Sequence, residues 1–209
     1  MEPVAGSLIR HVMFDADGVL QHVPGGWIAV AEPYFGDRTL EFLQRAYEAE
    51  LPTLAGHGDH LAIVAAALAE YGVTAPVADV YRDIWLCMEP VAASFAVVAA
   101  LRAAGYGVHL GTNQEPYRAA HMREKLGYDD LFDVCCYSCE LGAAKPDPAF
   151  FAEAARRIGA GPAAILFIDD SAANVAAARE AGLAAGQWSI DEGHDSLRRL
   201  LARHGAGLP

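Results

Sequence analysis

The chain has 209 residues, of which 54% are hydrophobic and 20% charged, which excludes a disordered protein and suits one sizeable core with a small added subdomain. Its 27 acidic and 15 basic side chains give a formal net charge of −12. A surface this negative repels phosphate backbones, so we expect no nucleic-acid partner.

Neither a targeting segment nor a membrane span is expected from the sequence. Residues 1–11 contain no long apolar stretch followed by a cleavage-like pattern, which argues against a signal peptide. The longest run rich in alanine and valine, Val91–Ala104, is interrupted by Arg102 and is too short to cross a bilayer. We therefore expect a cytoplasmic protein with no membrane partner.

The first part of the chain predicts one buried strand followed by a helical segment. Ile9–Phe14 is a short apolar run that ends in Asp-Ala-Asp-Gly, as a parallel strand does when it delivers polar residues at its carboxyl end. From residue 21 to residue 89 the apolar spacing is helical and no strand is predicted. The predicted helices are Arg38–Glu50, His57–Tyr71 and Val77–Met88, with breaks at Pro52, Gly56, Gly72 and Pro76. Residues 21–89 are thus predicted to form a small helical insert.

Strands and helices alternate in the rest of the chain. The predicted strands are Gly107–Gly111, Asp133–Tyr137, Ala164–Ile168 and Ala184–Gln187. The predicted helices are Ser94–Ala104, Tyr117–Leu126, Pro148–Ile158, Ala172–Ala181 and Asp191–His204. This order predicts an α/β fold, a doubly wound parallel sheet with helices on both faces. Ligands of such sheets bind at the carboxyl ends of the strands.

Two carboxylates, Asp15 and Asp17, follow the first predicted strand with one residue between them. Gly18 allows the turn that would bring both side chains into one site. One carboxylate could attack an electrophile while the other transfers protons to and from the leaving oxygen. We predict that Asp15 is the nucleophile.

A second acidic pair, Asp169-Asp170, ends another predicted strand. Four carboxylates in one crevice would repel one another strongly unless a divalent cation neutralised them. Mg²⁺ suits this arrangement, because it prefers oxygen ligands and retains waters and phosphate in its coordination shell. The sequence therefore predicts a magnesium site.

Two further features would complete a phosphate site. Thr112-Asn113 follows a predicted strand and supplies a hydroxyl and backbone N–H donors, and Lys145 lies in a loop stiffened by two prolines. An ammonium there would stabilise negative charge on a phosphoryl group in the transition state. Each feature alone has a structural explanation, such as a helix N-cap for Asp169-Asp170. All four together, each after a predicted strand, favour a catalytic site.

These residues resemble the four motifs of the haloacid dehalogenase-like hydrolase superfamily, a large group of phosphatases with an aspartate nucleophile. The motifs are Asp-Ala-Asp-Gly-Val-Leu from Asp15 to Leu20, Thr112-Asn113, Lys145 within Gly142–Phe151, and Asp169-Asp170-Ser171 continuing to Asn174. The resemblance extends from Val12 to Trp188. It implies a Rossmann-like core formed by residues 1–20 and 90–209, with residues 21–89 as the small helical cap of the family's first subclass.

The resemblance also implies a role for each motif residue. Asp15 would attack phosphorus and Asp17 would act as general acid and base. Mg²⁺ would be held by the Asp15 side chain, the Asp17 backbone carbonyl and Asp170, with help from Asp169. The transferring phosphoryl group would be bound by Thr112, the backbone N–H of Asn113 and Lys145.

The resemblance favours a phosphatase, a phosphoric monoester hydrolase acting on a small phosphorylated metabolite such as a sugar phosphate or a nucleoside monophosphate. The family's dehalogenases lack a carboxylate two residues after the nucleophile, where this chain has Asp17. Two alternatives stay open, a sugar-phosphate mutase of the same family and a non-catalytic phosphate-binding module. A mutase generally needs cap residues that retain a bisphosphorylated intermediate, and no basic residue from Gln21 to Asp37 obviously does this. A non-catalytic relative would be expected to lose Asp15, Asp17 or Lys145.

Substrate recognition has fewer signals in the sequence. His22, just after the first motif, either contacts the substrate or is a linker residue, and we include it among the candidate substrate-binding residues. Trp27 forms either an apolar wall or part of a core. The segment from Gly56 to Asp59 either faces the substrate or caps a helix through Asp59. The sequence gives no indication of the oligomeric state.

Overall fold

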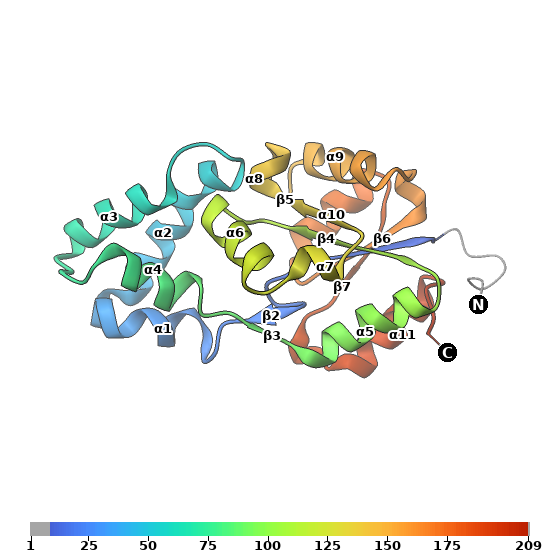
Figure 1. Cartoon of the computed structure of the whole chain (residues 1–209), viewed down its shortest axis with the longest axis horizontal. Helices are drawn as coiled ribbons and strands as arrows, with labels where there is room; N and C mark the ends of the chain where they lie inside the picture. The colour runs from blue at the N-terminus through green and yellow to red at the C-terminus, as the bar shows by residue number, and fades with distance from the viewer. Residues whose placement is uncertain (1–8, 209) are drawn as a thin grey trace.

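The computed structural model describes residues 9–208. A sheet with flanking helices forms one part of the molecule, and a group of helices forms the other, on the left in Figure 1. The absence of a signal peptide was expected largely from residues 1–8, which lie outside the described residues. Within residues 9–208, no helix combines the length and the apolar character needed to cross a membrane.

The sheet confirms the doubly wound parallel α/β fold. Over residues 9–208 it has five strands in the order β5-β4-β1-β6-β7, and every neighbouring pair is parallel. The strands are β1 (His11–Phe14), β4 (Gly107–Thr112), β5 (Val134–Tyr137), β6 (Ile165–Asp169) and β7 (Ala184–Gln187). The chain reverses its winding between β1 and its two neighbours β4 and β6. This is the switch point where such folds bind ligands.

Helices cover both faces of the sheet because the strands are apolar on both sides. In β1, Val12 and Phe14 pack on one face and Met13 on the other. The first face is covered by α5 (Ala92–Ala103), α6 (Pro116–Glu124), α7 (Tyr128–Leu131) and α11 (His194–Arg203). The second face is covered by α8 (Ser138–Leu141), α9 (Pro148–Ile158) and α10 (Ala172–Glu180). Two short 3₁₀ turns, η2 (Pro162–Ala164) and η3 (Ile190–Glu192), complete this part.

A separate hydrophobic cluster holds the remaining helices together. These are α1 (Gly26–Phe35), η1 (Gly36–Arg38), α2 (Thr39–Leu54), α3 (His60–Tyr71) and α4 (Val77–Trp85), which we call the helical insert. Stacked rings of Phe35 and Phe42, 3.6 Å apart, join α1 to α2. Asp59 caps α3 by accepting a hydrogen bond from the Leu61 N–H, so the structural explanation for this residue is the right one.

Two short strands connect the insert to the sheet. β2 (Gln21–His22) and β3 (Glu89–Pro90) pair antiparallel. The segment that enters the insert and the segment that leaves it therefore lie side by side. The prediction that residues 21–89 contain no strand was wrong here, because two-residue strands leave no alternation to detect. The predicted break at Pro52 was also wrong. Helix α2 continues through Pro52 to Leu54, since proline so near a helix end removes only one hydrogen bond.

Gly56 gives a test of the contact between the insert and the core. Its φ is +82°, and an added Cβ would lie 2.5 Å from the backbone oxygen of Cys139 in α8. We expect Gly56→Ala to lower the free energy of unfolding by about 2–4 kcal/mol, because φ strain and a clash with backbone act together. Gly72→Ala is the matched control, since its φ is +71° with no atom within 4 Å. If urea unfolding gave the same decrease in the free energy of unfolding for both variants, the contact with Cys139 would contribute nothing to stability.

Candidate functional site

The predicted site residues meet where the central strands end. Asp15 follows β1, Thr112 is the last residue of β4 and Asp169 is the last residue of β6. Because these three strands are parallel neighbours, their polar ends reach the same edge of the sheet. The structure therefore brings together side chains that lie far apart in the sequence.

A buried ammonium joins two of the carboxylates. The Lys145 Nζ lies 2.8 Å from Oδ1 of Asp15 and 2.7 Å from Oδ2 of Asp169, and it also donates to the Gly111 carbonyl at 3.0 Å. Burial alone would lower the pKa of Lys145, but Asp15 and Asp169 outweigh it and raise that pKa. Lys145 is therefore a fixed positive charge between two acidic side chains.

The side chain of Asn113 positions the loop that carries Lys145. Its amide nitrogen donates to the Lys145 carbonyl and its amide oxygen accepts from the Lys145 N–H, both at 2.8 Å. This paired contact fixes the backbone of Lys145 relative to the end of β4. The sequence analysis considered only the backbone N–H of Asn113, and the bridging by its side chain was missed.

Three carboxylates form a group that suits a metal ion. One oxygen from each of Asp15, Asp169 and Asp170 lies within 4.8 Å of the others. Asp170 reaches this position beside Gly18, where any Cβ would collide with its carboxylate. The side chain of Asn174 and the N–H of Ser171 hold Asp169 from the other side. Oxygen donors of this kind and number fit Mg²⁺.

The pKa values in this group reflect burial first and nearby negative charge second. Burial raises the pKa of Asp15 to about 7, with Asp169 and Asp17 adding to the rise and Lys145 opposing it. Burial and the nearby Asp169 also raise the pKa of Asp170. A divalent cation would favour the ionised forms of both carboxylates.

Asp17 faces a different set of partners. Its Oδ1 accepts hydrogen bonds from Gln21 at 2.8 Å and Arg118 at 3.0 Å, and its Oδ2 accepts one from Gln114 at 3.1 Å. Burial alone would raise the pKa of Asp17, but the charge of Arg118 and these hydrogen bonds outweigh it and lower that pKa. The Asp17 carboxylate lies outside the metal-binding group, so only its backbone carbonyl stays a predicted ligand.

Arg118 and Gln114, which both contact Asp17, are the candidate site residues that sequence reasoning missed. Arg118 comes from α6 and is buried, with its guanidinium 5.6 Å from the Trp27 ring centre. Gln114 is also buried, and its side-chain amide donates to the Thr112 hydroxyl as well as to Asp17. The sequence signal that could have identified them is their position, because both residues closely follow the Thr112-Asn113 motif.

A cavity of about 630 Å³ opens between these carboxylates and the helical insert. It is lined by every predicted site residue except Asp169, which lies beneath the others and is fully buried. His22 reaches the cavity from β2 and Trp27 from α1. The insert contributes further lining residues, mainly from α2, namely Leu43, Ala46, Tyr47, Glu50, Leu51, Leu54 and, from α4, Trp85.

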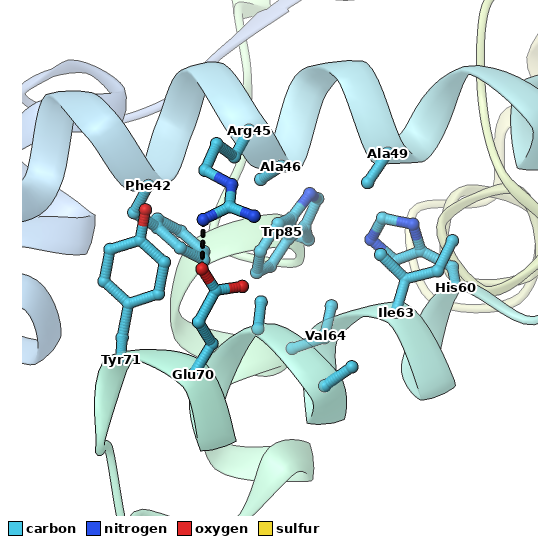
Figure 2. Close-up of a pocket in the computed structure, with 12 residues that line it drawn as sticks. Phe42, Arg45, Ala46, Ala49, His60, Ile63, Val64, Glu70, Tyr71 and Trp85 are labelled. Atoms are coloured by element: carbon cyan, nitrogen blue, oxygen red, sulfur yellow. Dashed lines mark hydrogen bonds and ion pairs between the residues drawn. The ribbon is translucent and has the colours of Figure 1, made fainter.

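A second cavity, of about 240 Å³, lies within the insert between α2 and α3 (Figure 2). Its lining is mainly apolar, and an ion pair of Arg45 and Glu70 crosses it. His60 faces it at one end (Figure 2), and neither ring nitrogen has a hydrogen-bond partner. The two cavities share Ala46 and Trp85, but the second contains none of the carboxylates described above.

Comparison with known proteins agrees with this geometry. The sequence model of the haloacid dehalogenase-like hydrolase family matches residues 9–182. A sesquiterpene phosphatase from Aspergillus oryzae is 31% identical over 108 residues, which are 51% of this chain and 55% of that protein. The chain thus matches about half the length of this curated relative.

Solved structures share the fold over nearly the whole chain. A hydrolase of this family from Porphyromonas gingivalis is 24% identical with a TM-score of 0.76, covering 93% of this chain and 98% of that one. A family member from Bacteroides thetaiotaomicron, solved with magnesium and inorganic phosphate, is 19% identical with a TM-score of 0.76. The match covers 90% of this chain and 98% of that one. These similarities establish the fold.

Glu50 makes the stability of the protein depend on pH. Burial raises its pKa from an ordinary value of 4.5 to about 7, with Glu115 and Asp17 adding to the rise against Arg118. Because the pKa of Glu50 is higher in the folded state, its contribution to the free energy of unfolding is fully present below pH 4.5. That contribution is lost as the pH rises through 7. We therefore expect Glu50→Gln to be more stable than the wild type at pH 8, with a smaller advantage at pH 5, in urea unfolding. Glu48→Gln, at an exposed position of α2, should show no such difference. A flat profile for both variants would contradict the desolvation of Glu50, which is half-buried beside the cavity.

Proposed function

This chain belongs to the haloacid dehalogenase-like hydrolase family, and we propose that it is a magnesium-dependent phosphatase that hydrolyses a phosphate monoester through a phosphorylated Asp15. The observation that carries the proposal is the contact of Lys145 with Asp15 and Asp169 beside a third carboxylate, Asp170. This arrangement combines a positioned nucleophile, a fixed cation and a cluster of oxygen ligands. The phosphatase relative and the neighbour solved with magnesium and phosphate support it.

The first half of the reaction would transfer the phosphoryl group to Asp15. Two donors hold Oδ1 of Asp15, the Lys145 ammonium and the Ala16 N–H at 2.7 Å, and so fix the orientation of the carboxylate. A carboxylate oxygen forms the new bond to phosphorus while the ester P–O bond breaks. Asp17 gives its proton to the leaving alcohol oxygen. Lys145 and Thr112 would stabilise the charge on the phosphoryl oxygens.

The second half would regenerate the enzyme. Asp17 takes a proton from water, the water oxygen attacks phosphorus, and the bond between phosphorus and Asp15 breaks to release phosphate. Arg118, Gln21 and Gln114 favour the ionised form of Asp17 before the substrate arrives. The approach of a phosphate dianion would raise the pKa of Asp17 and so favour the protonated form that the first half needs.

Asp15, Asp169 and Asp170 would hold Mg²⁺, with the backbone carbonyl of Asp17 as a further ligand. The ion would neutralise part of the negative charge of the phosphate and of the surrounding carboxylates. We also propose that the helical insert is the cap of this site and that His22 contacts the substrate, because both line the same cavity as the carboxylates.

Hydrolysis accounts for the cavity better than the mutase alternative does. Among the described residues, the part of the cavity lined by the insert contains no lysine or arginine. A bisphosphorylated intermediate would need such a cation to hold its second phosphate. The remaining cations of the cavity, Lys145 and Arg118, already contact Asp15, Asp169 and Asp17.

Replacing the nucleophile tests the mechanism. We expect Asp15→Asn to lower phosphate release from p-nitrophenyl phosphate by at least about a thousandfold, because an amide oxygen cannot form the phosphorylated intermediate. Circular dichroism should show an unchanged fold, since the two side chains have the same shape. Asp130→Asn, on the exposed surface of α7, is the control and should keep full activity. Wild-type turnover by Asp15→Asn would refute a role for Asp15 as the nucleophile.

Metal removal tests the cofactor separately. We expect EDTA to abolish activity and added Mg²⁺ to restore it. Calorimetric titration should show that Asp170→Asn binds Mg²⁺ at least about tenfold more weakly than the wild type, because one of three carboxylate ligands becomes neutral. Asp130→Asn should bind normally. Full activity in thoroughly stripped protein would remove Mg²⁺ from the mechanism.

A further inference from the structure

Helix α2 has two apolar faces, one that packs toward α3 and one that lines the catalytic cavity. Phe42 and Ala49 point toward α3 in Figure 2. Leu43, Tyr47, Leu51 and Leu54 recur every three or four positions on the face that lines the catalytic cavity. This second set of residues, which we call the α2 stripe, runs along the helix for about three turns.

The middle of the α2 stripe remains accessible, whereas Leu54 at its end is buried and Leu43 packs against the core of the insert. Tyr47 is 64% exposed and Leu51 is 48% exposed, while Trp27 across the cavity from α1 is 37% exposed. Apolar surface that lines a site without being buried by the protein's own packing is typical of a ligand-binding wall. This wall and the carboxylates of Asp15 and Asp170 line the same cavity.

Few polar groups on this wall could recognise a sugar or a nucleoside. Among the described lining residues from β2 and the insert, the polar side-chain groups are those of His22 and Glu50, the Tyr47 hydroxyl and the indole N–H groups of Trp27 and Trp85. A polyhydroxylated substrate would lose hydrogen bonds to water on entering and regain few of them from leucine and tryptophan side chains. An apolar chain would instead gain free energy for each methylene removed from water.

We propose that the substrate is a phosphate monoester of an extended apolar alcohol, with its phosphate at Lys145 and its chain along the α2 stripe. This inference rests on the proposed phosphatase function and narrows it to one substrate class. It differs from the sugar phosphate or nucleoside monophosphate that the sequence led us to expect. The helical insert then selects substrates by apolar contact, and the core residues supply binding and chemistry at the phosphate.

A series of linear alkyl phosphates tests this proposal with the full chain and Mg²⁺. From ethyl through butyl and hexyl to octyl phosphate, kcat/KM for phosphate release should rise by about two- to fourfold per methylene. Glucose 6-phosphate should be a poorer substrate than octyl phosphate. A kcat/KM independent of chain length, or a preference for glucose 6-phosphate, would overturn the apolar substrate class and leave the phosphatase function intact. If no compound of the series, nor p-nitrophenyl phosphate, is hydrolysed, the phosphatase function itself fails.

A matched pair of variants on one helix locates the effect. Leu51→Gln should lower kcat/KM for octyl phosphate by about tenfold, mainly through a higher KM, and leave ethyl phosphate unchanged. Leu40→Gln is the control, because Leu40 lies on the same helix, is 67% exposed and is absent from the cavity lining. Both leucines are well exposed, so both variants should fold. The same dependence on chain length in Leu51→Gln and Leu40→Gln would refute binding along the α2 stripe.

Discussion

The site depends on one buried ammonium held between two buried carboxylates. Lys145 contacts Asp15 and Asp169 within 2.8 Å, and all three residues are almost inaccessible to water. Burying such charges is costly unless they are paired, and loss of the ammonium would leave two uncompensated negative charges in the interior. The loop of Lys145 must therefore stay docked on the strand ends. The side chain of Asn113 secures it there through two hydrogen bonds.

The fold and this central group could be predicted because they arise from local patterns. Each of Asp15, Thr112 and Asp169 stands at the end of an apolar run, and alternating strands and helices define a parallel sheet. Parallel strands that are neighbours deliver their ends to one edge, so the meeting of these residues follows from topology without any knowledge of side-chain contacts. The family assignment from the four motifs agrees with the family match over residues 9–182.

The surroundings of Asp17 could not be predicted, because they come from contacts between distant segments. Arg118 is 101 positions from Asp17, and Gln114 is 97 positions away. Both residues lie in a stretch whose polar pattern is ordinary for the start of a surface helix, yet both are buried. Helix α1 was missed for a local reason. Pro33 lies within it, Gly25 is its N-cap and Gly26 is its first residue, so its sequence resembles a loop.

Gln21 links the chemistry to the position of the helical insert. Its side chain donates to Asp17 and accepts from the Tyr128 hydroxyl, while its backbone belongs to β2 and pairs with Pro90 in β3. Any movement of the insert about these two strands would begin beside a side chain that holds Asp17 in place. Because Gln21 contacts Tyr128 of α7 as well as Asp17, the position of the Asp17 carboxylate is tied to the core. In the function proposed above, the centre for phosphoryl transfer belongs to the core, and the apolar wall that would select the alcohol belongs to the helical insert.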